Sequence, residues 1–363
     1  MQIVETTQAY EAWLRSQTSL LPRDLRAKHK AMAEGAFPFL RATFYCWAQL
    51  WPRRCPDLTQ TPTVLAVGDL HVENFGTWLD SEGRLIWGVN DFDESHPMPY
   101  ANDLVRLAAS ARLAIRENHL ACDPERACDA VLEGYKEAIG KRGSPLILAE
   151  HNRWLRTLAL NKRRHPVAFW RKLEKAKAST KPVTMLRRAL EEHLPGPVVG
   201  QRFVHRQAGV GSLGRHRYTL LGEWEGSRIA REAKPLVPSA WVWAGNQSDD
   251  SKLWYHTILN QAVRVADPFL KVRERWVLRR LAPDCSRIEL SHLPKQRDEL
   301  RLLRAMGWET ANIHLGSTKV VPRIRKDLQT RNKSWLRDAA ERMEQATIAD
   351  WKQWKRYWKR SRR

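Results

Sequence analysis

The sequence predicts an α+β protein made of a mostly helical part and a small antiparallel β part. Apolar side chains recur at helical spacing through most of the first half of the chain, whereas strand-like alternation and glycine-containing turns begin after "HLPGPVVGQ". With 363 residues, 43% of them hydrophobic, the chain can bury a sizeable core. We expect segments at 1–196 (helical, with an acidic site), 197–292 (β) and 293–363 (helices that return to the first part and a basic tail).

The first segment is expected to contain helices interrupted by two short strands. Helical spacing covers the first 50 residues, with a break at Pro38. The strands are "TVLAVGDL" and "GRLIWGVNDFD", and the helix "ANDLVRLAASARLAIREN" follows. More helices run from Cys128 to about Leu194. Each strand ends in acidic residues and a short turn joins them, so we expect the two acidic loops to lie at neighbouring strand ends.

The second segment reads as strands from Gln201 to Trp243, followed by the helix "SKLWYHTILNQAVRVA" and the β-like "ERWVLRRLAPDCSRIEL". The third contains the helix "LRLLRAMGWETANIHLGS" and ends in "WKQWKRYWKRSRR".

Charge and cysteine content restrict the partners and the compartment. The 62 Lys and Arg residues outnumber 40 Asp and Glu by 22, which attracts anions and disfavours polycationic partners. The five cysteines are scattered and never form a CxxC, as expected of thiols in a reducing cytoplasm. Since no stretch reaches roughly 18 uninterrupted apolar residues, we expect a cytoplasmic protein without a transmembrane segment.

The acidic loops "VGDLHVENFGTW" and "NDFDES" allow two interpretations. In a binuclear metallophosphatase, Asp69 and His71 would bind metal, but such a site needs four or more further ligands and no second strand-end cluster of histidines is present. In phosphoryl transfer, Asp69 is the catalytic base, and Asn74 and Asp91 hold Mg²⁺ or Mn²⁺. Asp93 either supports the metal or binds a backbone N–H.

Three neighbouring side chains are expected to support this site. His71 is expected to hydrogen-bond the loop backbone, and Glu73 to be solvated or to assist its neighbours. Asp103 is expected to cap its helix or brace the catalytic loop.

The loops "GDLHVEN" and "NDFDE" resemble the catalytic and metal loops of the aminoglycoside and choline phosphotransferase branch of kinase-like enzymes. Val67 stands where that pattern has a leading His. The order of "KAMAEGAFPFLRA", "VGDLHVENFG", "NDFDES", "DLVRLAAS", "GVGSLGRHRY" and "ADPFL", from about Arg26 to Ser317, resembles the uncharacterised bacterial family called domain of unknown function 2252.

A nucleotide-binding part is expected after the catalytic loop, because mostly helical residues precede Asp69. Gly209, Gly211 and Gly214, with Ser212 between them, form a G-x-G-x-x-G that either cradles phosphates or makes a plain hairpin turn. Lys234 on the next strand favours the cradle. A dinucleotide-binding loop would need a helix directly after the glycines, where "RHRYTLL" is strand-like.

Kinases usually pair this lysine with a Glu on the next helix. None is present there, and Gln261 is the nearest polar substitute. The helix "LRAMGWETANIHLGS" resembles the one that precedes the catalytic loop in small-molecule kinases. The resemblance and this order imply a circularly permuted, two-lobed protein kinase-like fold.

The sequence therefore predicts an ATP- and Mg-dependent phosphotransferase with an unknown hydroxyl-bearing acceptor, neutral or anionic. Nucleotidyl transfer would use the same parts. The alternatives are a catalytically silent nucleotide- or nucleic-acid-binding protein on the same fold and, third, the metallophosphatase. The tail either binds nucleic acid or an anionic membrane surface, or packs its Trp face on the body; its candidate polyanion-binding residues are Lys352, Lys355, Arg356, Lys359 and Arg360.

Overall fold

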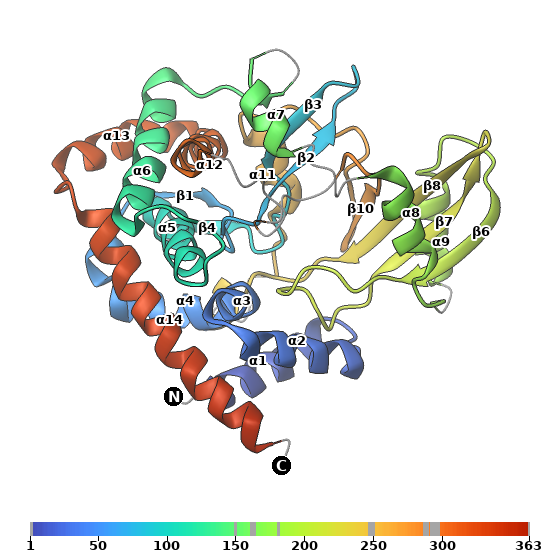
Figure 1. The fold of residues 1–363 in the computed structure, drawn as a ribbon, viewed down its shortest axis with the longest axis horizontal. Coiled ribbons are helices and arrows are strands. Elements are labelled where there is room, and N and C mark those ends of the chain that lie inside the picture. The colour runs from blue at the N-terminus through green and yellow to red at the C-terminus, as the bar shows by residue number, and fades with distance from the viewer. Residues whose placement is uncertain are drawn as a thin grey trace.

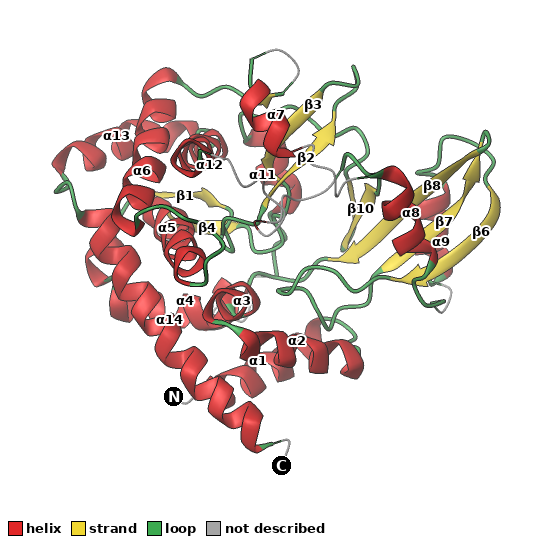
Figure 2. Ribbon diagram, viewed as in Figure 1, coloured by secondary structure: helices red, strands yellow, loops and turns green. Residues whose placement is uncertain are grey.

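Two lobes, one mostly helical and one built on a five-stranded sheet, make up the described part of the chain (Figure 1). The computed structural model describes residues 3–148, 151–159, 165–179, 182–245, 251–285, 290 and 298–361. Helices dominate, and the sheets are small and antiparallel (Figure 2). The predicted mixed class with a small antiparallel β part is confirmed at this level.

The helical lobe packs around α5, whose residues are buried on nearly every side. Leu104, Val105 and Ala108 of α5 are fully buried, so the helix is enclosed by its neighbours. The helices of this lobe are α1 (Ile3–Gln17), α2 (Pro22–Glu34), α3 (Ala36–Ala42), α4 (Phe44–Arg54), α5 (Tyr100–Arg116), α6 (Pro124–Lys141), α7 (Arg153–Ala159), α12 (Glu299–His314), α13 (Val321–Thr330) and α14 (Trp335–Arg360).

Two small sheets in this lobe end at the acidic loops. Strand β1 (Thr63–Ala66) pairs with β4 (His96–Pro99). Strands β2 (Phe75–Leu79), β3 (Leu85–Val89) and β5 (Leu146–Ile147) form the second sheet, with β3 in the centre. The acidic loops thus follow β1 and β3, which belong to different sheets. The expectation of neighbouring strand ends was therefore wrong at the level of the sheet, although the loops do meet.

The second lobe is a sheet with a helix on each face. Its strands are ordered β6 (Val199–His205), β7 (Tyr218–Trp224), β8 (Ser227–Pro235), β10 (Trp276–Arg280) and β9 (Lys271–Arg273). Leu173 of α8 (Pro166–Glu174) packs on Leu221, and Leu190 of α9 (Thr184–Glu191) packs on Leu220. Because successive strand residues point to opposite faces, α8 and α9 cover different faces. Both helices precede residue 197, yet they pack on this sheet.

The chain returns to the helical lobe through α10 (Ala240–Ala244), α11 (Tyr255–Gln261) and α12. The end of α12 lies beside β1, because Leu65 N–H donates to Ser317 Oγ at 3.0 Å. His314 of α12 lies 3.1 Å from the Asp103 carboxylate. The end of α12 and the residues after it thus pack beside β1 and α5, the strand and the helix next to the first acidic loop.

Three boundaries differ from the expected ones. The early helices break at Gly35 and Thr43, whereas Pro38 lies in the first turn of α3, where its missing N–H is not needed. Strand β2 was read as loop. Helix α11 ends at Gln261, because Val263 N–H donates to Asn312 O at 2.9 Å and leaves the helical path. The last part of the predicted strand "ERWVLRRLAPDCSRIEL" lies outside the described residues.

Two further expectations concern thiols and membranes. All five cysteines are unpaired. Among the described residues, no helix is both long enough and apolar enough to cross a bilayer.

Candidate functional site

The Asp69 loop (residues 67–74) is held by a side chain of α5. The N–H groups of Val67 and Gly68 donate to the two carboxylate oxygens of Asp103, at 2.7 and 2.9 Å. Gly68 has φ of +82°, and a side chain there would collide with the backbone carbonyl of Glu94. Asp103 therefore braces the loop, one of the two roles expected for it.

Asp69 is fixed by a residue one turn further along α5. Arg106, fully buried, donates from Nε (3.0 Å) and Nη2 to Asp69 Oδ1. Among the described residues, no donor contacts Asp69 Oδ2, which lies 3.4 Å from the position that a Cβ on Gly211 would take. Burial outweighs Arg106 and raises the pKa of Asp69 to about 7. One oxygen is thus anchored, and the other can accept a proton near neutral pH.

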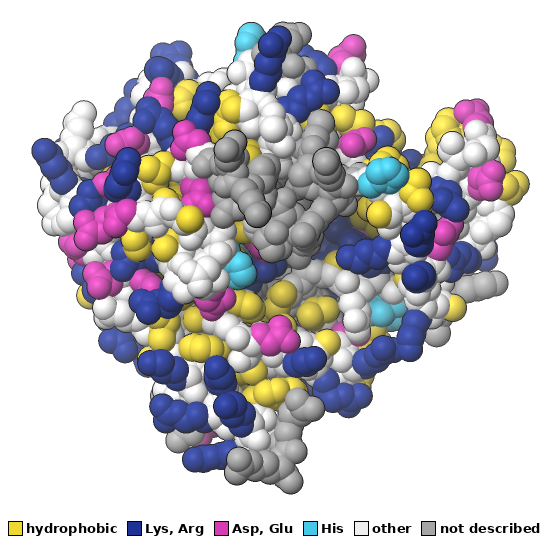
Figure 3. All heavy atoms as spheres, in the orientation of Figure 1, with side chains coloured by type: hydrophobic (Ala, Val, Ile, Leu, Met, Phe, Trp, Pro, Cys, Tyr) yellow, Lys and Arg dark blue, Asp and Glu magenta, His cyan; other side chains and the backbone are white. Residues whose placement is uncertain are grey.

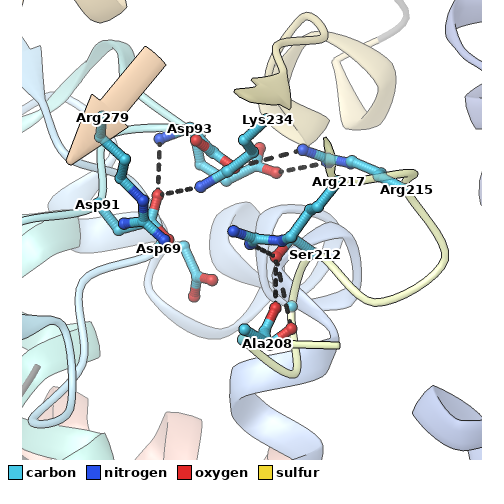
Figure 4. A network of polar contacts seen from close by, with 12 residues as sticks. Asp69, Asp91, Asp93, Ala208, Ser212, Arg215, Arg217, Lys234 and Arg279 are labelled. Carbon is cyan, nitrogen blue, oxygen red and sulfur yellow. Dashed lines mark hydrogen bonds and ion pairs between the residues drawn. The ribbon is translucent and has the colours of Figure 1, made fainter. Parts of the chain in front are cut away.

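The Asp91 loop (residues 90–95) is held by side chains from the other lobe. Lys234 of β8 lies with Nζ 2.9 Å from Asp91 Oδ1 and 2.6 Å from Asp93 Oδ2 (Figure 4). Arg215 lies 3.4 Å from Asp93 and 3.7 Å from Glu94. The structure therefore brings together Lys234 and Asp91, which are 143 residues apart in sequence.

The two carboxyl groups of this loop differ in their protonation. Burial raises the pKa of Asp91, but the Lys234 ammonium outweighs it and lowers the net value. Burial and the neighbouring Asp91 carboxylate raise the pKa of Asp93. Asp93 Oδ1 is buried without a hydrogen-bond partner among the described residues. An orphaned carboxylate oxygen of this kind fits a divalent cation, which takes hard oxygen ligands.

Asn74 provides a further oxygen next to this pair. Its side-chain N–H donates to the Asp69 backbone carbonyl. Its Oδ1 accepts no hydrogen bond from the described residues. Within the described ranges, no group of three or more His, Cys, Asp or Glu side chains is arranged to hold a metal ion. The ligand set on offer is therefore two carboxylates and one amide, which suits a cation that keeps several waters.

The glycine-rich loop joins β6 to β7 and faces the Asp69 loop. Gly209 and Gly211 line a cavity together with Asp69 and Asp91. Among the described residues, the N–H groups of Gly209 and Gly211 donate to no partner. Ser212 Oγ accepts from Arg217 Nη2 at 2.5 Å. These free N–H groups are suited to phosphate oxygens.

Gly214 has a different place from the other two glycines. Its carbonyl accepts from Leu21 N–H at 2.7 Å, and a side chain there would meet Leu25 of α2. Gly214 therefore anchors the loop to α2 and does not line the cavities described here.

Two cavities meet at the acidic loops. The smaller, about 50 Å³, lies beside Asp69 and is walled by residues of α1, α2 and α4. The larger, about 710 Å³, lies between the lobes and has the size of a ligand site. Asn74, Asp91 and Gly209 line both. Two of the residues expected to hold metal, Asn74 and Asp91, thus stand where the two cavities adjoin, and Asp93 lines only the smaller one.

Arginines give the wall of the larger cavity an excess of positive charge. Glu232, two residues before Lys234, contacts Arg206, Arg217 and Arg279 at 2.7, 2.9 and 2.6 Å. Burial raises the pKa of Glu232, but the three guanidinium groups outweigh it and hold the pKa well below its usual range. One carboxylate among three cations leaves net positive charge where phosphates could bind.

The remaining predicted residues have supporting or distant positions. His71 Nδ1 accepts from Glu73 N–H at 3.2 Å and so braces the loop. Glu73 is buried and lies 2.5 Å from Arg41, so the expectation of a solvated side chain was wrong. Gln261 is exposed at the end of α11, and Lys234 pairs with the acidic loop instead.

Residues 351–360 of the basic tail form the end of α14. Trp354 is buried and donates from Nε1 to His29 O at 3.1 Å, so this aromatic side chain packs on the body. The charged side chains form a basic surface over the end of α14 (Figure 3). Lys352, Arg356, Lys359 and Arg360 are exposed, and Lys355 is half-buried.

Sequence reasoning missed several basic residues of the site. Arg106 follows Asp103 by three positions, so helical spacing places both on one face. Arg215 directly follows the glycine motif. Lys28 and Arg41 reach the site only through tertiary packing, and no local pattern marks them.

The comparisons with known proteins agree with the family expectation over part of the chain. The sequence model of the family described as "Uncharacterized protein conserved in bacteria (DUF2252)" matches residues 20–187. This segment contains both acidic loops and α5, and the family resemblance is confirmed there. No curated protein and no solved structure matches the chain.

Proposed function

We propose that the protein is an ATP- and Mg²⁺-dependent phosphotransferase of permuted kinase-like architecture, acting on a hydroxyl-bearing acceptor. One observation carries the proposal: the Lys234 ammonium meets the Asp91 and Asp93 carboxylates across the lobes. In kinases, the glycine-rich loop joins the first two strands of the nucleotide lobe, a lysine on the third strand binds phosphates, and a strand-end Asp holds the metal. Here β8 is the third strand in chain order of its sheet.

The larger cavity has the volume and charge that a nucleotide needs. The Gly209 N–H and the arginines around Glu232 line this cavity and are proposed to bind the phosphates. Lys234 lines neither cavity and is proposed to bind phosphate from its position beside Asp91, which lines both. Asn74, Asp91 and Asp93 are the residues proposed to hold Mg²⁺, which when bound would supply positive charge to the phosphates.

Asp69 is proposed to act on the acceptor. Its free Oδ2 accepts the proton of the acceptor hydroxyl as that oxygen bonds to the γ-phosphorus and the bond from phosphorus to ADP breaks. Arg106 keeps the carboxylate oriented through Oδ1. The products are ADP and the phosphorylated acceptor, and the proton leaves Asp69 to solvent.

The test is nucleotide-dependent thermal unfolding of the wild type, Asp91→Ala and Lys234→Ala. ATP at a hundred times its dissociation constant adds about 2.7 kcal/mol to the free energy of unfolding. We expect this gain in the wild type with Mg²⁺ and its loss in both variants. Lys271→Ala, an exposed lysine on edge strand β9, is the matched control and should keep it. A wild type that ATP and Mg²⁺ do not stabilise contradicts the proposal.

The products distinguish phosphoryl from nucleotidyl transfer. Release of ADP supports phosphoryl transfer, whereas release of pyrophosphate would replace it with nucleotidyl transfer on the same residues. Saturable ATP binding without either product, across a panel of neutral and anionic alcohols, would support a silent nucleotide-binding protein.

A second candidate function rests on the exposed basic surface of α14. Polyanion binding of this kind weakens steeply with salt, because each neutralised phosphate releases counter-ions. We expect the quadruple variant Lys352→Glu, Arg356→Glu, Lys359→Glu, Arg360→Glu to lose any single-stranded nucleic-acid binding and to keep ATP-dependent stabilisation. Wild type that shows no salt-dependent binding removes this candidate.

A further inference from the structure

The smaller cavity is bounded by a buried lysine for which the proposed phosphotransferase chemistry has no use. Lys28 of α2 is 3% exposed, and its Nζ donates to Gly211 O at 3.1 Å. The Tyr45 ring lies 5.8 Å from the same nitrogen. An ammonium has three N–H donors, so these contacts leave donor capacity unused beside the cavity.

Lys28 also lacks an anionic partner, unlike the other cations of the site. Arg41 pairs with Glu73, and the guanidinium of Arg106 pairs with Asp69. Lys234 and Arg215 pair with carboxylates of the Asp91 loop. Among the described residues, no carboxylate lies within ion-pair distance of Lys28. A buried charge without a counter-ion is costly, and burial lowers the pKa of Lys28 to about 8.

Arg215 adds a second buried donor to the same cavity. Its side chain is 4% exposed, and its Nε has no hydrogen-bond partner among the described residues. Lys28 and Arg215 come from different lobes and both line the smaller cavity. Four carboxylates also line it: Asp69, paired with Arg106, and Asp91, Asp93 and Glu94, paired with Lys234 or Arg215. Two buried cations with spare donors therefore adjoin the carboxylate that faces the acceptor.

We propose that the smaller cavity is a subsite for an oxyanion, a carboxylate or phosphate group on the acceptor, with Lys28 as its principal counter-ion. This inference rests on the proposed phosphotransferase function and narrows its acceptor to an anionic alcohol. The volume agrees: about 50 Å³ holds a small polar group, since a water needs roughly 10–15 Å³. The oxyanion occupies this cavity while the acceptor hydroxyl reaches Asp69 Oδ2.

The location separates this subsite from the nucleotide cavity. Its walls come from α1, α2 and α4 through Tyr10, Lys28 and Tyr45, none of which lines the larger cavity. Lys234 and the arginines around Glu232 serve the nucleotide side. The two cavities share Asn74, Asp91 and Gly209, so the acceptor and the nucleotide would meet at the acidic loops.

The test measures binding of inorganic phosphate and of acetate by calorimetric titration, without nucleotide. Both anions are tested because the group on the acceptor is proposed to be either a phosphate or a carboxylate. We expect saturable binding of at least one to wild type, and a dissociation constant at least tenfold larger in Lys28→Met, which keeps the length of the side chain and removes the charge. Lys30→Met, an exposed lysine on the same helix, should bind as wild type does.

The two proposals fail separately. Wild type that binds neither oxyanion, or Lys28→Met that binds as tightly as wild type, overturns the subsite. Lys28→Gln repeats the comparison if the Met variant does not fold. Phosphate or acetate binding through Lys28 in a protein that fails to bind ATP leaves the subsite and removes the phosphotransferase. If wild type binds ATP but Lys28→Met binds the oxyanions as tightly as wild type does, the phosphotransferase proposal stands and the subsite proposal is wrong.

Discussion

The two acidic loops of this protein are held in opposite ways. Hydrogen bonds from α5 of the same lobe fix the backbone of the Asp69 loop, through Asp103. The carboxylates of the Asp91 loop are fixed by Lys234 and Arg215, which belong to the other lobe. The Asp69 loop is therefore set within its lobe, whereas the Asp91 loop depends on how the lobes meet.

Under the proposed function, this difference gives the two loops different tasks. A loop with one anchored and one free carboxylate oxygen is suited to a fixed chemical role on the acceptor. A loop whose carboxylates are neutralised by a lysine from the other lobe is suited to bind a metal in place of that lysine. The lysine is then available to bind phosphates. Changes to the Asp69 loop should thus affect transfer, and changes around the Asp91 loop should affect nucleotide binding.

The largest expected effect is on the rate of phosphoryl transfer when Asp69 is replaced, with ATP binding unchanged. Asp69→Asn removes the proton acceptor and keeps the size of the side chain, so the rate of transfer should fall by about 10²- to 10⁴-fold. ATP-dependent stabilisation should stay within twofold of wild type in apparent dissociation constant, since Asp69 does not contact the nucleotide side. A rate that survives this substitution removes Asp69 as the base.

Breaking the contact between lobes should destabilise the protein without nucleotide. Lys234→Met leaves Asp93, 10% exposed, without its closest cation. Loss of one partner of a buried pair costs on the order of 3 kcal/mol, and the more exposed Asp91 contributes less. Urea denaturation measures the loss. An unchanged free energy of unfolding would mean that the lobes do not depend on this contact.

Weakening the hydrogen bonds from Asp103 to the Asp69 loop should lower the free energy of unfolding by less than Lys234→Met does. Asp103→Asn keeps one acceptor oxygen and leaves one buried N–H, of Val67 or Gly68, without its acceptor, for about 2 kcal/mol. The Ser110 hydroxyl, which accepts from Val72 N–H at 3.1 Å, still holds the loop in this variant. Nucleotide affinity should change little, and a loss as large as that in Lys234→Met would erase the distinction between the loops.

The smallest expected effect is the pH dependence of transfer. Asp69 accepts a proton only when ionised, and its pKa is about 7, so the ionised fraction grows as pH rises through 7. The rate of transfer should therefore fall about tenfold from pH 8 to pH 6, following one ionisation. ATP affinity over the same range is the control. A rate that rises as the pH is lowered contradicts this role.

The sequence predicted what local spacing can encode. The order of Asp69, Asn74 and Asp91 predicted that they share a site, and all three line the smaller cavity; the β lobe was predicted by its turns and alternation. Strand β4 was missed because Pro97 and Pro99 argue against a strand, yet proline is tolerated in an edge strand such as this one, paired only with β1.

What the sequence did not encode depends on tertiary packing. Lys28 meets Gly211 across 183 positions, and Lys234 takes its partners from the Asp91 loop instead of from a helix. Such contacts have no local signal, because they arise only when the two lobes and α2 pack together. The expected role of Gln261 came from an analogy of helix order, whereas Gln261 is exposed at the end of α11 and Lys234 pairs with Asp91 and Asp93.

The central claim is that Lys234 and the Asp91 loop form one nucleotide site across the lobes. Its most direct test is calorimetric titration of wild type and Lys234→Met with ATP in the presence of Mg²⁺. The proposal predicts saturable one-to-one binding to wild type and a dissociation constant at least tenfold larger in the variant, with Lys271→Met unchanged. Equal affinity in wild type and Lys234→Met, or no binding to wild type, contradicts it.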